Sequence, residues 1–166
     1  MFWQYTKKIS NAYFSDFLHL FSPKTCLVCG GLLQEKSKII CFICSNNLPL
    51  TEQHQNPYEN DLAKIFWGRV NIEAASAYMF FQKGLKTQKI LHALKYKNKP
   101  ELGIEIGEKY GNILKNIDVF KSADCIIPVP LHTNRQHERG YNQSELIALA
   151  LAQRGAFEFT SNMLSR

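Results

Sequence analysis

Four cysteines, arranged as two Cys-x-x-Cys pairs, carry the clearest chemistry in this sequence. Cys26 and Cys29 form the first pair, and Cys41 and Cys44 form the second, with eleven residues between the pairs. Each Cys-x-x-Cys turn aims two thiolates at one point, so two turns supply the four sulfurs that close the coordination shell of a zinc ion. A closed shell leaves no position for a substrate. The sequence therefore predicts a structural zinc site.

A redox dithiol and four unrelated thiols are the alternative interpretations of these cysteines. A single Cys-x-x-Cys pair is typical of redox proteins, whereas a doubled pair at short spacing favours a metal site. Zinc is the expected ion, and iron is a substitute during expression. The fifth cysteine, Cys125, lies in an apolar run and is interpreted as a buried core thiol.

The start of the chain and its hydropathy bear on where the protein works. Its first residues place apolar side chains before charged ones, which is the reverse of a signal peptide. No run approaches the roughly 18 apolar residues that a spanning helix needs. We therefore expect a cytoplasmic protein with no membrane span, in a compartment where free thiols persist.

The composition of the 166-residue chain is that of a basic globular protein. Hydrophobic residues make up 45% and charged residues 20% of the chain, which excludes a disordered protein. Twenty Lys and Arg residues against 14 Asp and Glu residues give a net charge of +6. Such a surplus favours anionic partners such as nucleic acid, although it says little about the fold.

Lysines are concentrated in one segment of the chain. Six of them lie between residues 83 and 99 with no acidic residue among them, and the aromatic residues Phe80, Phe81 and Tyr96 flank them. Single-stranded DNA suits such a surface because phosphates contact lysines and bases stack on aromatic rings. A solvated helix face is the alternative. The candidates for nucleic-acid contact are Lys86, Lys89, Lys95 and Lys97.

A second group of polar residues lies between a predicted strand and a predicted helix. The apolar run at 123–129 leads into a Pro-Val-Pro turn, and a helix begins near Asn142. Loops at the carboxyl ends of parallel strands bind ligands in α/β proteins, and arginines beside a helix N-terminus can bind phosphate. Two solvated arginines are the alternative. The phosphate-loop candidates are His132, Arg135, Arg139, Gly140, Asn142 and Gln143.

Hydrophobic periodicity predicts the elements that must position these residues. Strands are expected at 74–81, 123–129 and 157–160, and helices at 9–21, 87–96, 100–114 and 142–153. Strands that alternate with helices favour an α/β fold with a parallel sheet. The expected parts are an amphipathic helix within 1–22, a zinc module at 23–48, a polar linker at 49–72 and a sheet domain at 73–166.

These motifs, in this order, resemble the ComF family of competence proteins. The doubled Cys-x-x-Cys is followed by Leu94-Lys95-Tyr96, by Pro-Val-Pro-Leu-His132 and by Arg139-Gly-Tyr-Asn-Gln143, so the resemblance runs from about Pro23 to Arg166. It implies a double zinc ribbon followed by a type I phosphoribosyltransferase-like domain. It also implies a pyrophosphate-contacting loop at 130–140, and a role in DNA uptake with single-stranded DNA and competence or recombination proteins as partners.

The chain departs from that family at the phosphoribosyl pyrophosphate motif. Type I phosphoribosyltransferases bind ribose phosphate and Mg²⁺ through two adjacent acids and a Thr-rich, Gly-containing loop, and this chain has no two adjacent acidic residues. We therefore expect a partial, C-terminally truncated domain without catalysis. Mg²⁺ and phosphoribosyl pyrophosphate would bind only to an intact homologue.

Three function classes remain open from the sequence. The first is an accessory protein of DNA uptake with a structural zinc site. The second is a phosphoribosyltransferase in its intact form. The third is a zinc-stabilised interaction module without a DNA role.

Overall fold

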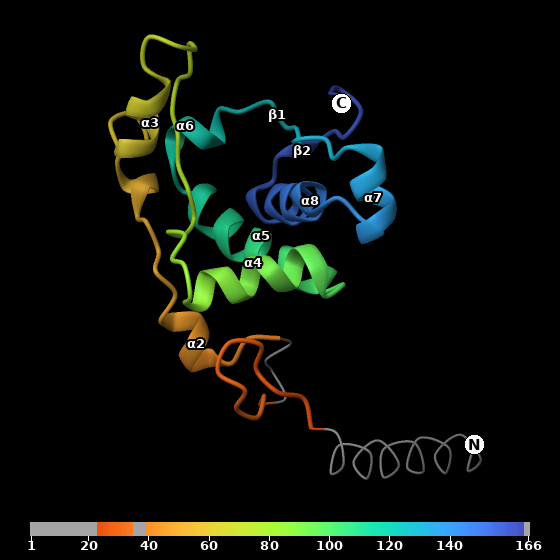
Figure 1. The fold of residues 1–166 in the computed structure, drawn as a ribbon. Coiled ribbons are helices and arrows are strands. Elements are labelled where there is room, and N and C mark those ends of the chain that lie inside the picture. Colours follow the sequence, from red (N-terminus) through yellow and green to blue (C-terminus); the bar gives the residue numbers. More distant parts are fainter. Residues whose placement is uncertain (1–22, 35–38, 165–166) are drawn as a thin grey trace, which may run out of the picture. The chain divides into compact units, whose positions relative to one another are not determined.

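The structure is a computed structural model that describes residues 23–34 and 39–164 (Figure 1). The chain divides into two compact units, residues 1–47 and residues 48–166. The amphipathic helix expected within residues 1–22 lies outside the described residues.

The described part of the first unit contains a short antiparallel turn and one short helix. An isolated bridge pairs Thr25 with Leu32. Helix α2 (Phe42–Asn46) begins directly after Cys41, whose side chain accepts a hydrogen bond from the backbone N–H of Cys44. Both cysteine pairs therefore lie where the chain changes direction.

The second unit is mixed α/β, with many helices and a small parallel sheet. Strands β1 (Cys125–Ile126) and β2 (Glu158–Phe159) are parallel, with Cys125 opposite Glu158 and Ile126 opposite Phe159. Figure 1 shows α8 beside these two strands. The helices are η1 (Gln53–Gln55), α3 (Asp61–Phe66), α4 (Lys86–Tyr96), α5 (Pro100–Leu114), α6 (Asp118–Lys121), α7 (Thr133–Arg139) and α8 (Gln143–Gly155).

The three long helices confirm the predictions made from periodicity. Helix α5 begins at Pro100, where the fixed φ of proline suits the first helical position and its missing N–H removes no intrahelical bond. Helix α8 begins after Asn142, whose side chain accepts a hydrogen bond from the N–H of Ser144 at 3.0 Å. The hydrophobic side chains buried on α4, α5 and α8 are Ile90, Ala93, Leu94, Leu102, Tyr110, Leu114, Ala148, Ala150 and Ala152.

Helices α5 and α8 approach each other closely because glycines line one face of α5. A Cβ atom at Gly107 would meet the carbonyl oxygen of Ile147 and lie 2.8 Å from the Cβ of Ala150. A Cβ atom at Gly111 would lie 2.7 Å from the carbonyl oxygen of Leu151. Backbone atoms cannot move aside cheaply, so larger residues would push the helices apart. The glycines on this face are Gly103, Gly107 and Gly111.

The sheet is smaller than the sequence predicts. Residues 74–81, expected as a strand, contribute only an isolated bridge between Met79 and Leu50. Residues 123–129, expected as a buried strand, contain the two-residue β1, and the side chain of Val129 is 66% exposed. Cys125 is half-buried. The physical reason is that β1 has a single strand neighbour, β2, within the described residues.

A two-stranded sheet does not show a phosphoribosyltransferase-like domain. Residues 49–72, for which we expected a linker, contain η1 and α3 and belong to the same compact unit as the helices that follow. The side chain of Asn60 begins α3 by accepting from Leu62 and Ala63, and it donates to the carbonyl of Ala75 at 2.7 Å. This segment is therefore packed rather than free.

Candidate metal centre

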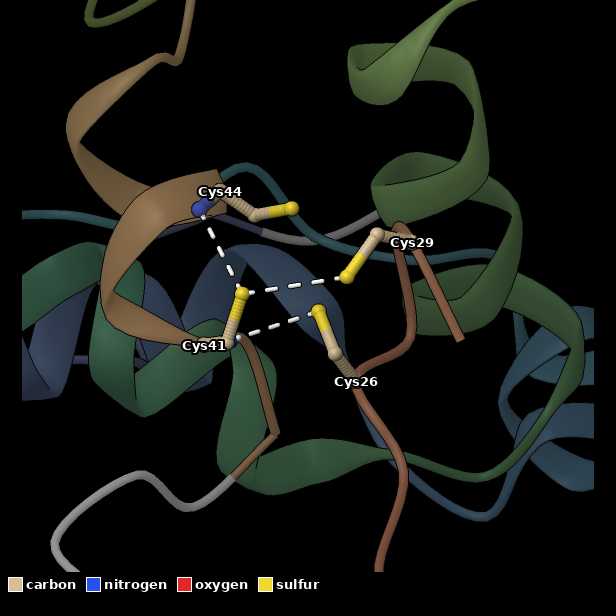
Figure 2. A group of neighbouring side chains, drawn as sticks. All are labelled: Cys26, Cys29, Cys41 and Cys44. Atoms are coloured by element: carbon tan, nitrogen blue, oxygen red, sulfur yellow. Dashed lines mark hydrogen bonds between the residues drawn. The ribbon is translucent and has the colours of Figure 1, made fainter. Parts of the chain in front are cut away.

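The four paired cysteines come together in the first unit, with their sulfur atoms facing one another (Figure 2). The Sγ atoms of Cys26, Cys29, Cys41 and Cys44 all lie within 4.8 Å of one another. The Sγ atoms of Cys29 and Cys41 are 3.8 Å apart. Four sulfurs at about 2.3 Å from a tetrahedral zinc ion would be about 3.8 Å from each other. The spacing of the cluster therefore fits a metal ion at its centre.

The first cysteine pair is positioned by a tight backbone turn. The N–H of Cys26 donates to the carbonyl of Gly31 at 2.7 Å, and the N–H of Gly30 donates to the carbonyl of Cys26 at 2.9 Å. Gly30 has φ 76°, in the left-handed region that glycine enters without a steric penalty. This turn brings Cys26 and Cys29 to the same side of the chain.

The second cysteine pair is positioned by the start of α2. The N–H of Cys44 donates to the sulfur of Cys41 at 3.4 Å, and the N–H of Cys41 donates to the sulfur of Cys26 at 3.3 Å. The second of these bonds joins the two turns directly. Hydrogen bonds from backbone N–H groups favour the thiolate form of a cysteine, which is the form that binds metal.

The thiols of Cys26 and Cys44 differ widely in pKa, so they do not carry the same charge. Burial raises the pKa of Cys26, but hydrogen bonds from the backbone N–H groups of Cys41, Cys29 and Val28 and from the Cys29 side chain lower it, to about 6 overall. At Cys44 burial and the neighbouring cysteine side chains both raise the pKa, to about 12. Four thiolates at this spacing repel one another. A bound cation would remove that repulsion and displace the remaining protons.

Exposure also differs around the cluster. Cys26 and Cys44 are 2% and 5% exposed, whereas Cys41 is half-buried and Cys29 is exposed. Val28 and Ile40 are buried as well.

Four sulfur ligands suit zinc and iron far better than the hard cations Mg²⁺ and Ca²⁺, which prefer oxygen. The residues present therefore fit a thiolate-bound metal with no open coordination position.

The phosphate-loop candidates are divided between α7 and the start of α8. His132, at the start of the expected basic loop, precedes a short helix, α7, and its Nδ1 accepts from the N–H of Asn134 at 3.3 Å. Arg135 is exposed on α7, and Gly140 ends that helix with φ 75°. Apolar periodicity could not predict α7 because its sequence, Thr-Asn-Arg-Gln-His-Glu-Arg, has no apolar residue.

The other three candidates hold the junction between α7 and α8. The guanidinium of Arg139 donates to the Oε1 of Gln143 at 2.7 Å. The side-chain amide of Asn142 donates to the carbonyl of Val129 at 3.2 Å. Asn142 and Gln143 are each 8% exposed. These groups contact one another and the backbone, while Arg135 lies apart on the exposed surface of α7.

The nucleic-acid candidates follow α4 to its C-terminal end. Lys86 is half-buried, and the other three are exposed, with Lys97 directly after the helix. His92 is exposed on the same helix, and its ring centroid lies 5.1 Å from that of Tyr96. The exposed candidates are Lys89, Lys95 and Lys97.

Two features of the second unit were not predicted from the sequence. The hydroxyl of Tyr141 donates to the carbonyl of Leu94 at 2.6 Å and so fixes the start of α8 against α4. No local pattern could identify that pair, since the residues are far apart in the chain. The glycine face of α5 was visible in principle, because its glycines recur at every fourth residue of a predicted helix.

Comparison with known proteins finds no matching family model, no matching curated protein and no matching solved structure. Within the part of the chain that the structure describes, no helix is both long enough and apolar enough to cross a membrane. What the structure establishes is a mixed α/β chain with a cluster of four cysteines that could hold a metal ion.

Proposed function

We propose that this chain is a ComF-like accessory protein of DNA uptake, with a structural zinc ion in its first unit and a DNA-contacting surface along α4. The observation that carries the proposal is the four-cysteine cluster, whose sulfurs lie within 4.8 Å of one another. The order of the motifs, from the cysteine pairs to Arg139-Gly-Tyr-Asn-Gln143, supports the ComF-like assignment.

A structural role for zinc follows from the donor set. Four thiolates complete the tetrahedral shell, so a bound water or substrate has no position at the ion. The first unit buries few side chains within its described residues, namely Cys26, Val28, Ile40 and Cys44. An ion that joins both turns would therefore supply much of the folding free energy of this unit.

Weak, sequence-independent binding of single-stranded DNA follows from the lysines of α4. Lysine contacts phosphate as a point charge and reads no base, so counterion release dominates the binding free energy. Contact with about four phosphates of a single strand would give a salt slope near −3, at roughly −0.7 per phosphate. Poly-dT and mixed sequences should bind alike.

Fluorescence anisotropy with the full, zinc-loaded chain tests this proposal at several salt concentrations. The variant K86Q/K89Q/K97Q should bind more weakly and flatten the salt slope by about 2. The control K64Q/K115Q/K121Q removes the same charge from exposed lysines outside α4 and should leave the slope nearly unchanged. Zinc content should be the same in all three proteins.

The outcome of that titration separates the candidate functions. If the wild-type protein binds no oligonucleotide at low salt, the DNA role is wrong, and the chain is an interaction module. If both triple variants lose affinity equally, the net charge matters and α4 is not the contact surface.

Phosphoribosyl transfer is the competing class, and the chemistry of the chain disfavours it. No two acidic residues are adjacent anywhere in the chain, so the paired carboxylates that orient the ribose and Mg²⁺ are missing. We expect no Mg²⁺-dependent heat when phosphoribosyl pyrophosphate is titrated into the protein in a calorimeter. Micromolar, Mg²⁺-dependent binding would contradict this expectation and restore the enzyme hypothesis.

A further inference from the structure

Two groups of residues that are distant in the sequence meet at the C-terminal end of α4. Tyr96 is the last residue of that helix, and its side chain is 66% exposed. The guanidinium carbon of Arg139, the last residue of α7, lies over the Tyr96 ring at 5.4 Å from its centroid. The ring centroid of His92, which is also on α4, lies 5.1 Å from that of Tyr96. We call these three residues the Tyr96–Arg139 corner.

The corner is held in place by buried groups. Arg139 donates to the Oε1 of Gln143, which is 8% exposed at the start of α8. The hydroxyl of Tyr141 donates to the carbonyl of Leu94, which is 2% exposed within α4. The arginine and the tyrosine ring are thus positioned before any ligand arrives, which lowers the entropy lost on binding.

Lysines beside the corner add positive charge. Lys95 and Lys97, on either side of Tyr96 in the chain, are exposed, and neither forms an ion pair within residues 23–34 and 39–164. Proteins bind the nucleotides of a single strand with groups of these kinds, namely a planar aromatic ring, a guanidinium group and neighbouring ammonium groups. The base stacks on the planar groups while the phosphates contact the cations.

We propose that the Tyr96–Arg139 corner stacks one base of single-stranded DNA while the adjacent phosphates contact Lys95 and Lys97. This inference rests on the proposed DNA-binding function and assigns it a contact point. It also gives Arg139 a role different from that of a pyrophosphate ligand, because its guanidinium is engaged by Gln143 and by the Tyr96 ring. Stacking is tolerant of sequence, so the site would accept any base.

A binding cycle with abasic DNA tests the stacking directly. Wild-type protein and the variant Tyr96→Leu are titrated, at one low salt concentration, with oligo-dT and with an oligomer of equal length that carries abasic sites. Both oligomers have the same phosphates, so their difference measures the contribution of the bases. We expect base removal to weaken binding by the wild-type protein about tenfold more than binding by Tyr96→Leu.

Two controls isolate the ring from general effects. Tyr96→Phe keeps the ring and should behave as the wild-type protein. Tyr58→Leu removes another tyrosine ring, which is 55% exposed outside the corner and outside the lysine segment, and should leave the difference between the oligomers unchanged. Circular dichroism and zinc content should be the same for all variants, because Tyr96 is largely exposed.

The outcomes distinguish this inference from the proposed function. If Tyr96→Leu and the wild-type protein lose the same factor on base removal, the corner stacks no base, although the lysines of α4 can still bind phosphate. If the wild-type protein binds neither oligomer, both the stacking site and the DNA-binding function are wrong.

Discussion

In the described part of the first unit, two of the four buried apolar side chains are cysteines. In the α5–α8 pair the buried residues are glycine, alanine, leucine and tyrosine, with Gln143 at the start of α8. The first region gathers four thiols whose proposed partner is a metal ion from outside the chain. In the second region, the backbone of α5 packs closely against the backbone of α8. With the proposed metal bound, the same chain relies on ligation in one unit and on the close fit of two helices in the other.

Removing the metal should produce the largest difference between the two regions. Structural zinc in zinc-finger peptides contributes apparent binding free energies of about 10–16 kcal/mol at neutral pH, which is more than a unit this small can replace by packing. A strong chelator, or the substitution Cys44→Ser, should therefore abolish protection in residues 24–34 and 39–47 and leave α5 and α8 protected. Hydrogen exchange with mass spectrometry measures both regions in one sample.

Cys125→Ser is the matched control for this experiment. Cys125 lies on β1 in the second unit, so its loss should change neither the metal content nor the protection of the cysteine unit. Strong protection of residues 24–34 in a metal-free, reduced sample would show that ligation does not hold this region.

Acid should release the metal before it disturbs the helix pair. The folded-state pKa of Cys26 is lowered from 9.0 to about 6, so its stabilising contribution is complete above the unfolded value and is lost as the pH falls through about 6. Protons also compete with the metal for all four thiolates. Zinc release, followed with a chromogenic chelator, should increase between about pH 8 and pH 5. A release that does not depend on pH in this range would contradict thiolate ligation.

An added methyl group should disturb the helix pair without affecting the metal. Gly107→Ala would place a Cβ against the carbonyl oxygen of Ile147, and overpacking of this kind costs about 1–3 kcal/mol, partly offset by the better helix propensity of alanine. Gly103→Ala is the control, since its nearest neighbour is the flexible Cδ1 of Leu94 at 3.3 Å. Denaturant unfolding of the metal-loaded chain should show a clear loss of unfolding free energy for Gly107→Ala only.

The smallest expected effect concerns the start of α8. Asn142→Ala removes two hydrogen bonds, the N-cap bond from the N–H of Ser144 and the bond to the carbonyl of Val129. The loss of an N-cap lowers the free energy of unfolding by about 1 kcal/mol. Asn142→Asp keeps the accepting oxygen but cannot donate to Val129, so it should fall between the wild type and the alanine variant. If the aspartate variant is as unstable as the alanine variant, the bond to Val129 provides the stability and the cap does not.

Local patterns in the sequence were sufficient for the cysteine cluster and the long helices. The spacing of Cys26, Cys29, Cys41 and Cys44 determines which sulfurs can meet, because each turn is only a few residues long. Periodicity and end signals such as Pro100 likewise depend on neighbours within one or two turns. These predictions needed no knowledge of distant contacts.

The sheet and the α7–α8 junction could not be predicted in the same way. A strand becomes buried only when partners cover its edge and face, and the run at 123–129 has one such strand partner in the described residues. The contacts of Arg139 with Tyr96 and of Tyr141 with Leu94 join segments more than 40 residues apart. Such pairs follow from the packing of whole helices, which periodicity does not specify.

Closure of the cysteine cluster by a metal ion would also keep the entropy cost of lengthening the segment between its two pairs small. The ion would close a loop of eleven residues between Cys29 and Cys41. The entropy cost of closing a flexible loop grows only logarithmically, by about 0.6 kcal/mol for each doubling of its length. An inserted epitope or dye-binding peptide of similar length should therefore leave the metal bound and would make this segment a suitable position for a reporter.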